Sequence, residues 1–465
     1  MLPAGFLQQL KDALGDAALL TDSADCVAYS VDNSKQQALP QAVVLPRSHE
    51  QVAACIRLAH QRRVPVTARG RGTNTTGASV PIAGGLVMSL ERMNRIISVR
   101  PADRLLECEA GALNGEVQTA AGQHGLFWPP DPTSAGYSSV GGNLACGAGG
   151  PRAVKYGTAK DHVLGLRAVT GDGTSIRTGC KTTKGVVGYD FTRLLVGSEG
   201  TLAIITEATL RLTAKPPLLR TLRACYQDVQ SAALAVSRIM AQPLLPCALE
   251  FMDGTAVRLA QNYRDTGIPP ATGAVLLLQA DGDQQTIEAV VSAVAAAAGG
   301  NGLVQWQAAT DQQQADDLWA CRKALSPALR SLAPKKINED VAVPVSRIPE
   351  LIAGLQQLAE RHQVQIVNFG HAGNGNIHVN LLGNPDDAAE LRRMHACLDE
   401  VFRLVLELEG TLSGEHGVGL AKRDFVAWEI QPETLALMRS VKAQFDPAGI
   451  LNPGKTLPDA APTDS

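Results

Sequence analysis

Two glycine-rich segments in the second half of the chain carry residues that could bind a metal ion. The first, Gly370–Asn380, holds His371 and His378, and the second, farther along the chain, holds Glu415 and His416. Two imidazoles and one carboxylate are the ligand set of an open catalytic zinc site, which leaves a position for a substrate oxygen. Spacing alone leaves another interpretation open, in which these are ordinary hydrogen-bonded histidines of a protein core.

Two further glycine-rich tracts, in the first half of the chain, could bind phosphate. Arg69–Gly77 follows an expected strand and mixes glycines with small hydroxyl residues, so its backbone N–H groups could converge on an anion. Pro129–Gly150 is expected to be a long irregular stretch, and such loops inside a compact chain are usually functional. Together the tracts favour an extended, phosphate-bearing cofactor, although the first tract alone could equally be a mobile turn.

Neither tract has the pattern of a nicotinamide site, and a nucleotide P-loop is excluded by context. After Gly70 and Gly72 the third glycine of the dinucleotide fingerprint is missing, because Thr75 occupies its place. Gly449–Thr456 matches the P-loop spacing, but no helix can follow it before the chain ends, and Pro453 removes one backbone amide.

A domain boundary is expected at Lys215-Pro216-Pro217, because two consecutive prolines interrupt both helices and strands. Residues 42–67 predict a strand, a helix and a second strand, and residues 163–178 predict a hairpin with an Asp-Gly turn. Further strands are expected at residues 86–90, 96–99, 105–110, 201–212, 274–279 and 365–369, and helices at 1–15, 346–362, 386–409 and 432–445. This alternation predicts an α+β protein.

Composition supports a globular protein and argues against several classes of partner. The chain has 465 residues, of which 45% are hydrophobic and 19% charged, and its formal net charge is −3 without clustered basic residues, so nucleic acid is not an expected partner. No apolar stretch is long enough to span a membrane, and residues 1–15 predict an amphipathic helix instead of a signal peptide. The 9 cysteines show no C-x-x-C pair, which excludes an encoded iron–sulfur cluster and fits a reducing compartment.

These motifs in this order resemble the FAD-binding dehydrogenases of the vanillyl-alcohol oxidase superfamily, specifically the branch of D-lactate, glycolate and D-2-hydroxyglutarate dehydrogenases. The resemblance also rests on Val196–Leu202, Asn338–Pro344 and Phe445–Lys455. It implies an α+β fold with a two-subdomain FAD-binding domain of the PCMH/vanillyl-alcohol oxidase type at residues 1–215 and a ferredoxin-like α+β cap domain at 216–412. A C-terminal helical segment, 413–458, would return to the flavin, and 459–465 would be a disordered tail.

The resemblance also assigns roles to individual residues. His371, His378 and Glu415 correspond to ligands of a divalent metal, expected to be zinc, and His416 to the base that takes the substrate's hydroxyl proton. Arg322, on an expected helix, is a candidate for binding the substrate carboxylate, with a solvated helix-face arginine as the alternative, and Asn380 could also reach the substrate. The residues implied in FAD binding are Gly70, Arg71, Gly72, Thr73, Asn74, Gly77, Pro130, Asp131, Gly141, Gly142, Asn143, Gly197, Glu199, Gly200 and Asn452.

The implied reaction is metal-assisted oxidation of a D-2-hydroxy acid, with the C2 hydride passing to flavin N5. Asn338 stands where hydroxyglutarate enzymes carry a substrate lysine, which favours D-lactate over a diacid. D-2-hydroxyglutarate dehydrogenase, the FAD subunit of a glycolate oxidase that needs a separate iron–sulfur chain, and, more distantly, a zinc hydrolase are the alternatives.

The remaining expectations concern the state of the cofactor and the partners. Because the first glycine tract contains no histidine or cysteine, FAD should be bound non-covalently. The expected partners are a small 2-hydroxy acid and an electron acceptor, namely a quinone, a cytochrome, an electron-transfer flavoprotein or oxygen, with a homodimer as an option. The expected location is the cytoplasm, where the electron acceptor could bring the protein to the inner membrane as a peripheral component.

Overall fold

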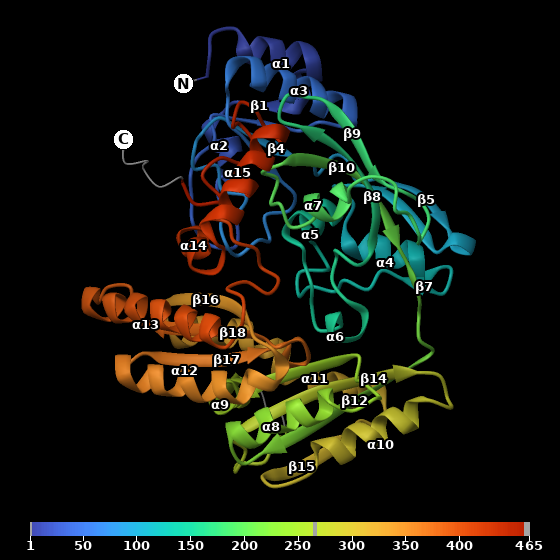
Figure 1. Ribbon diagram of the computed structural model, residues 1–465, viewed down its shortest axis with the longest axis vertical. Helices are drawn as coiled ribbons and strands as arrows, with labels where there is room; N and C mark the ends of the chain where they lie inside the picture. The colour runs from blue at the N-terminus through green and yellow to red at the C-terminus, as the bar shows by residue number, and fades with distance from the viewer. Residues whose placement is uncertain (1, 264–266, 460–465) are drawn as a thin grey trace. The chain divides into compact units, whose positions relative to one another are not determined.

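The chain forms two compact units in a computed structural model that describes residues 2–263 and 267–459 (Figure 1). Unit 1 contains Met1–Gly150, Gly157–Lys215 and Glu415–Ser465, and unit 2 contains Pro151–Tyr156 and Pro216–Gly414. The polypeptide therefore enters unit 2 briefly, returns to unit 1, and passes back into unit 2 at the two prolines. Of the tail expected to be disordered, residues 460–465 lie outside the described part of the chain.

A four-stranded sheet in unit 1 has the order β1-β2-β4-β3. Strands β2 (Ala42–Val44) and β3 (Val66–Arg69) lie parallel to β4 (Leu86–Ser89) on either side, and β1 (Leu19–Leu20) is antiparallel to β2. Helix α3 (His49–Arg62) connects β2 to β3, so the strand–helix–strand prediction is confirmed. The Ser48 side chain caps this helix by accepting from the Gln51 amide.

An antiparallel five-stranded sheet follows, with the order β5-β6-β10-β8-β9. The predicted hairpin is confirmed as its last two strands, and Gly173 has the left-handed conformation (φ 85) that the turn requires. The Asp172 carboxylate closes this turn by accepting from the Thr174 amide at 2.9 Å. The strands are β5 (Ile96–Arg100), β6 (Leu105–Glu109), β8 (Val163–Thr170), β9 (Ser175–Gly179) and β10 (Ala203–Arg211).

Shorter elements complete unit 1. The N-terminal helix α1 buries Phe6, Leu10 and Leu14 against the core of this unit, as its amphipathic pattern predicts. Among the helices built from residues 2–263 and 267–459, none is both long and apolar enough to cross a membrane. The other helices and strands are α1 (Phe6–Leu14), α2 (Ser23–Cys26), α4 (Asn114–Gly122), β7 (Leu126–Phe127), α5 (Val140–Cys146), α7 (Phe191–Leu195), β11 (Thr213–Ala214), α14 (Val426–Glu429) and α15 (Pro432–Phe445).

The C-terminal segment is an integral part of unit 1, although it is far from the rest of that unit in sequence. After α15, Leu451 forms a parallel bridge with Val66 at the start of β3. The buried Asp446 carboxylate fixes the intervening turn by accepting from the amides of Ile450 at 3.0 Å and Leu451 at 2.8 Å and from the Lys442 ammonium at 2.6 Å. The segment that follows, including Asn452, is thereby placed beside the first glycine tract.

Unit 2 is built on one antiparallel seven-stranded sheet with the order β15-β12-β14-β13-β17-β18-β16. Its first four strands have the order of a ferredoxin-like unit, fourth-first-third-second, which agrees with the expected cap. The strands are β12 (Leu218–Tyr226), β13 (Ala248–Asp253), β14 (Ala274–Gly282), β15 (Leu303–Ala308), β16 (Lys335–Ala342), β17 (Gln365–Gly370) and β18 (Asn376–Gly383).

Helices cover this sheet. Apolar residues of α9 (Gly254–Tyr263) and α11 (Gln312–Leu332) pack with Met252, Val275 and Leu277 on one face. Helix α8 packs on both α10 and α12, and α12 also packs on α13, as Figure 1 shows. These helices span Val229–Met240 for α8, Ile287–Ala298 for α10, Ile348–His362 for α12 and Ala388–Glu407 for α13, and the short α6 (Ala153–Tyr156) joins the same unit.

Replacing Asp446 by Ala should lower the free energy of unfolding by about 2–4 kcal/mol, because two buried amides and part of the Lys442 ammonium would lose their acceptor. Chemical denaturation followed by circular dichroism measures the change. Asp424→Ala removes an exposed acid from the same C-terminal segment and serves as the control, expected within about 0.5 kcal/mol of the wild type. An equal effect of both substitutions would contradict the assigned role of Asp446.

Candidate functional site

Strands β17 and β18 form the hairpin that carries both histidines. Their register pairs Phe369 with His378, and His371 directly follows the end of β17. The two imidazoles are buried, with ring centroids 5.1 Å apart and planes 85° apart. The hairpin therefore brings the two rings together.

The turn between the strands is tight enough to fix that geometry. It is a single 3-10 turn, Ala372–Asn374, and the His371 carbonyl accepts from the amides of Asn374 and Asn376. Gly375 ends it in the left-handed conformation (φ 73), and a Cβ there would lie 1.8 Å from the Val343 carbonyl oxygen. Only glycine can occupy this position without displacing backbone.

Glu415 is placed by the segment that precedes it. Thr411 and Ala342 exchange backbone hydrogen bonds, and the Gly414 amide donates to the Asp340 carbonyl at 2.8 Å, so this segment runs beside β16. A Cβ on Gly414 would come within 2.3 Å of the Asn376 side chain, which makes the close approach dependent on glycine. Glu415 follows directly, so chain continuity fixes its backbone relative to these strands.

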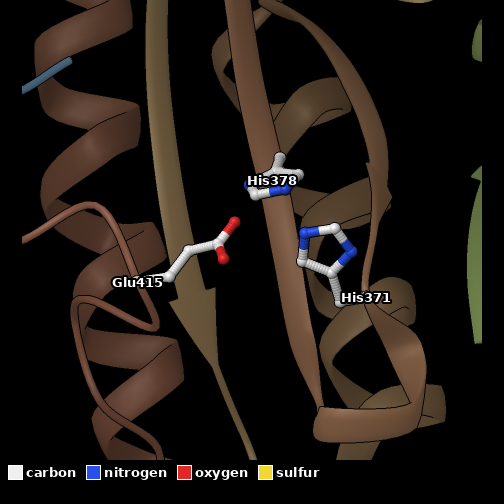
Figure 2. Close-up of side chains that lie close together, drawn as sticks. All are labelled: His371, His378 and Glu415. Carbon is white, nitrogen blue, oxygen red and sulfur yellow. The ribbon is translucent and has the colours of Figure 1, made fainter. Parts of the chain in front are cut away.

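The two imidazoles and the Glu415 carboxylate form a compact group. One potential ligand atom from each of His371, His378 and Glu415 lies within 4.8 Å of the others. Figure 2 shows the carboxylate turned toward the two rings. Two nitrogens and one oxygen in this arrangement suit a tetrahedral zinc ion, or a related divalent metal, with a coordination position left for substrate.

A buried carboxylate behind His371 supports this fit. Glu250, which is 0% exposed on β13, accepts a hydrogen bond from His371 Nδ1, an arrangement that leaves Nε2 for a metal. Its other oxygen accepts from Arg322 Nε at 2.7 Å. Burial alone would raise the pKa of Glu250, but the neighbouring imidazole and guanidinium hold that pKa well below its usual range.

Arg322 and Phe369 complete the support of the two rings. The Arg322 guanidinium carbon lies 4.7 Å from the centroid of the Phe369 ring, and that ring meets His378 edge-on at 5.7 Å. Arg322, expected to bind the substrate carboxylate, is thus paired through Nε with Glu250. Its side chain is 13% exposed, so the solvated helix-face alternative does not describe it.

Asn380 lies two residues beyond His378 on the same face of β18 and is fully buried. Its Nδ2 donates to the backbone carbonyls of Val367 and His378, at 3.0 and 3.1 Å, whereas Oδ1 has no hydrogen-bond partner among the described residues. A buried acceptor without a partner is costly, so this oxygen suits a ligand donor.

His416 is held through its backbone by the first glycine tract. Its carbonyl accepts from Asn74 Nδ2 at 3.0 Å, while Asn74 Oδ1 accepts from the amides of Thr76 and Ala78. The His416 side chain is 23% exposed, and its Nε2 lies 3.9 Å from Glu415. The imidazole is therefore partly accessible to solvent.

The two glycine tracts predicted to share a ligand lie against each other within unit 1. A Cβ on Gly70 would come within 2.3 Å of Ser139 Oγ, and Asn74 Nδ2 lies 3.4 Å from Cys146 Sγ. Gly72 and Gly77 have left-handed backbones, and Arg71 is exposed while Thr73 is partly so. Loops this close can present backbone amides to one extended anion.

The second tract is not wholly irregular, contrary to the sequence expectation. Gly141, Gly142 and Asn143 lie in helix α5, whose N-terminus is capped by Ser139 accepting from the Gly142 amide. Glycine is a poor helix former, but a Cβ on Gly141 would come within 2.6 Å of Ala110, so packing requires it. The cap and this close contact outweigh the propensity.

Unpartnered polar atoms in this tract support a cofactor there. Ser138 Oγ and Asn143 Nδ2 are buried and have no hydrogen-bond partner among the described residues. A phosphate or ribose oxygen could satisfy Asn143, and the residues present therefore fit the predicted FAD. Nearby, the Pro130 carbonyl accepts from Asn114, and a Cβ on Gly150 would overlap Asp131.

The remaining predicted FAD residues, Gly197, Glu199, Gly200 and Asn452, lie in unit 1 as well. Asn452 Nδ2 donates to the carbonyls of Glu199, at 2.7 Å, and of Ala78, at 2.9 Å, so the C-terminus does return to the first tract. The Glu199 carboxylate accepts from the amides of Val418 and Gly419 and from Thr456 Oγ1. Burial raises the pKa of Glu199, and its carboxylate is engaged with the chain itself.

Sequence reasoning missed Glu250 altogether. It stands between Leu249 and Phe251 in a strand whose other residues up to Met252 are apolar, and an acid within such a run was the one signal available. Its partner His371 is 121 residues away, a separation that no local pattern reveals.

Comparison with known proteins agrees with this architecture. Residues 40–179 match the family described as FAD binding domain, and residues 215–456 match the family described as FAD linked oxidases, C-terminal domain. The structure resembles that of p-cresol methylhydroxylase with substrate bound, with a TM-score of 0.78 and 17% identity over 98% of each chain. At that identity the likeness concerns the fold alone.

Three relatives in sequence cover nearly the whole chain. The glycolate oxidase subunit GlcD of Bacillus subtilis (strain 168) is 37% identical, over 98% of this chain and 97% of its own. A D-lactate dehydrogenase of Anaerostipes hadrus is 33% identical over 90% of each, and the D-2-hydroxyglutarate dehydrogenase of Stutzerimonas stutzeri (strain A1501) is 32% identical over 98% and 99%. The chain therefore belongs to the FAD-linked oxidases, a family of FAD-dependent oxidoreductases, and has the FAD-binding fold of the PCMH/vanillyl-alcohol oxidase type.

Proposed function

We propose that the protein oxidises a D-2-hydroxy acid, D-lactate before others, to the corresponding 2-oxo acid. The observation that carries the proposal is the convergence of His371, His378 and Glu415 in a chain of the FAD-linked oxidases. The relatives named as hydroxy-acid oxidases and dehydrogenases support the substrate class. When bound, FAD supplies an acceptor for the C2 hydride, and a divalent ion supplies a Lewis acid that acidifies the hydroxyl group.

The residues of the chain divide the remaining work. His371, His378 and Glu415 hold the ion, and His416 takes the hydroxyl proton as the C2 hydride leaves, so that the alcohol loses one proton and one hydride and becomes a ketone. The partial exposure of His416 lets it pass the proton on to solvent. Asn380 Oδ1 is an acceptor and does not suit the substrate carboxylate, and it can accept from the hydroxyl group only before His416 takes that proton.

A monoacid suits this site better than a diacid. In the register of β16 against β18, Asn338 lies opposite Asn380 and Asp340 lies opposite His378. Paired residues share a face of the sheet, so this face presents an amide and an acid beside the ligand histidine. A second substrate carboxylate would meet no cation at these positions, and Lys336 is two residues farther along and exposed.

A second candidate is a subunit role in a larger oxidase. One relative that matches almost end to end is named as a subunit of glycolate oxidase, which favours this candidate. The two candidates differ in what the isolated chain can do, because a self-sufficient dehydrogenase turns over with an artificial electron acceptor and a dependent subunit does not.

Anaerobic addition of D-lactate to the purified protein should bleach the flavin absorbance at about 450 nm, because the hydride reduces the ring. L-lactate should leave the band unchanged. A panel of D- and L-2-hydroxy acids, from glycolate to malate and 2-hydroxyglutarate, with an artificial acceptor and with or without a chelator, then ranks the substrates. Preparations without flavin, or with flavin that no 2-hydroxy acid bleaches, would contradict the proposal.

His378→Ala should abolish turnover and the bound divalent metal while leaving FAD near one per chain, because the predicted FAD residues belong to unit 1 and His378 to unit 2. Metal analysis and the absorbance of released flavin measure the two contents. The exposed His395→Ala of unit 2 is the control and should retain both metal and FAD. Simultaneous loss of FAD and metal in His378→Ala would contradict the separation of the two sites.

His416→Gln should lower kcat by about 100-fold or more with metal and FAD retained, the usual scale for a positioned acid–base group. Steady-state rates with saturating D-lactate give the value. The exposed His124→Gln in the same unit should behave like the wild type. A rate within about threefold of the wild type would remove His416 from this role.

A further inference from the structure

The carboxylate of Glu250 bridges a side chain of the ligand group and a partly buried cation. One oxygen accepts from His371 Nδ1 and the other from Arg322 Nε, at 2.7 Å, and the Glu250 side chain is 0% exposed. All three residues belong to unit 2 and come from separate elements, β13, the end of β17 and α11. The contact is therefore a tertiary arrangement and not a by-product of local geometry.

We propose that Glu250 and Arg322 are positioning residues that set the orientation of His371 and thereby the metal affinity of the group formed with His378 and Glu415. This inference rests on the proposed function, since that function includes the metal. It gives Arg322 a role through Glu250 in addition to the expected binding of the substrate carboxylate, because the bond to Glu250 engages Nε.

The geometry gives each residue a specific task. An imidazole ring can rotate, and either nitrogen can carry the proton, so an unrestrained histidine presents the wrong atom part of the time. The Glu250 carboxylate fixes the Nδ1–H tautomer, which leaves Nε2 as the ligand and makes it more basic. Arg322 in turn fixes the carboxylate and is itself held over the Phe369 ring.

A second buried acid on the same strand shows what a purely structural carboxylate does. Asp253 accepts from the backbone amides of Ala256, at 2.8 Å, and Asn368, at 2.6 Å, where it caps α9 and ties β13 to β17. Both of these contacts are with backbone amides at the end of β13, and neither involves a side chain of the ligand group. Glu250 instead binds two side chains, a candidate metal ligand and an arginine, and such contacts orient side chains where those of Asp253 secure the backbone.

The test measures zinc affinity and not only activity. Apo-protein prepared with a chelator is titrated with Zn²⁺ in competition with a chromophoric chelator, and FAD content and circular dichroism confirm that each variant is folded. Glu250→Gln should weaken zinc binding about 10-fold and Glu250→Ala about 100-fold, the range found for partners of metal-bound histidines. Asp253→Asn, the matched control, should lower thermal stability and leave zinc affinity within about threefold of the wild type.

Arg322 is tested by separating affinity for the metal from affinity for the substrate. Arg322→Met should weaken zinc binding about 10-fold, whereas an arginine that only binds substrate would raise KM with zinc affinity unchanged. The double variant Glu250→Gln with Arg322→Met should recover thermal stability, because neither charge is then buried without its partner, but not zinc affinity. Recovery of both would show that the pair is structural and overturn the inference.

The outcomes also separate this inference from the proposed function. Wild-type zinc affinity in all Glu250 and Arg322 variants would overturn the positioning role and leave the proposed oxidation intact. Wild-type protein that binds no Zn²⁺ but whose flavin is bleached by D-lactate would overturn the inference together with the metal, and leave the flavin chemistry standing.

Discussion

Strand register is the constraint on which the candidate site depends. A strand presents alternate residues to one face, so a slip of one residue between β17 and β18 would turn His378 and Asn380 away from Glu250 and Arg322 together. The tight turn ending at Gly375 prevents that slip, since its backbone leaves no room for an additional atom beside Val343. This face of the sheet is apolar where α9 and α11 cover it, and it is polar on β18 and β16, beyond the Phe369 ring. The alternation of side chains along the strands therefore gives both the apolar core and the polar candidate site on one face.

The seven-stranded sheet brings Glu250, on β13, close to His371, which follows β17, through a short stretch of strand pairing that we call the seam. Strand β13 closes the ferredoxin-like half and pairs with β17 only at Phe251 and Met252, opposite Gly370 and Phe369. Glu250 lies next to this seam, and His371 emerges just past it. Asp253 strengthens the same seam by accepting from the Asn368 amide. In unit 1 the corresponding connection is the parallel bridge of Leu451 to Val66, by which the C-terminal segment sets Asn452 against the first glycine tract.

Those parts of the fold that depend on local pattern could be predicted from the sequence. The apolar spacing of α3 and the Asp-Gly turn of the β8–β9 hairpin are short-range signals, and both elements form as expected. Helix α5 was not predicted, because its glycines lower helix propensity and the contact of Gly141 with Ala110 that compensates is long-range. Other long-range contacts could not be predicted for the same reason. Lys155 and Tyr156 belong to unit 2 because they bind Asp281, and the Glu199 carboxylate accepts hydrogen bonds from backbone amides far along the chain.

The charge of Glu250 is difficult to explain by stability alone. Taking a carboxylate and a guanidinium out of water costs several kcal/mol each, and apolar residues of similar volume often replace such a pair without loss. Apolar residues already occupy neighbouring positions of β13, namely Leu249, Phe251 and Met252, so an apolar residue could also have stood in place of Glu250. The pair instead adjoins one of two buried imidazoles, whose orientation a hydrophobic neighbour could not fix. The desolvation cost is therefore consistent with the proposed role of Glu250 in orienting His371, and in that proposal Arg322 neutralises the acid.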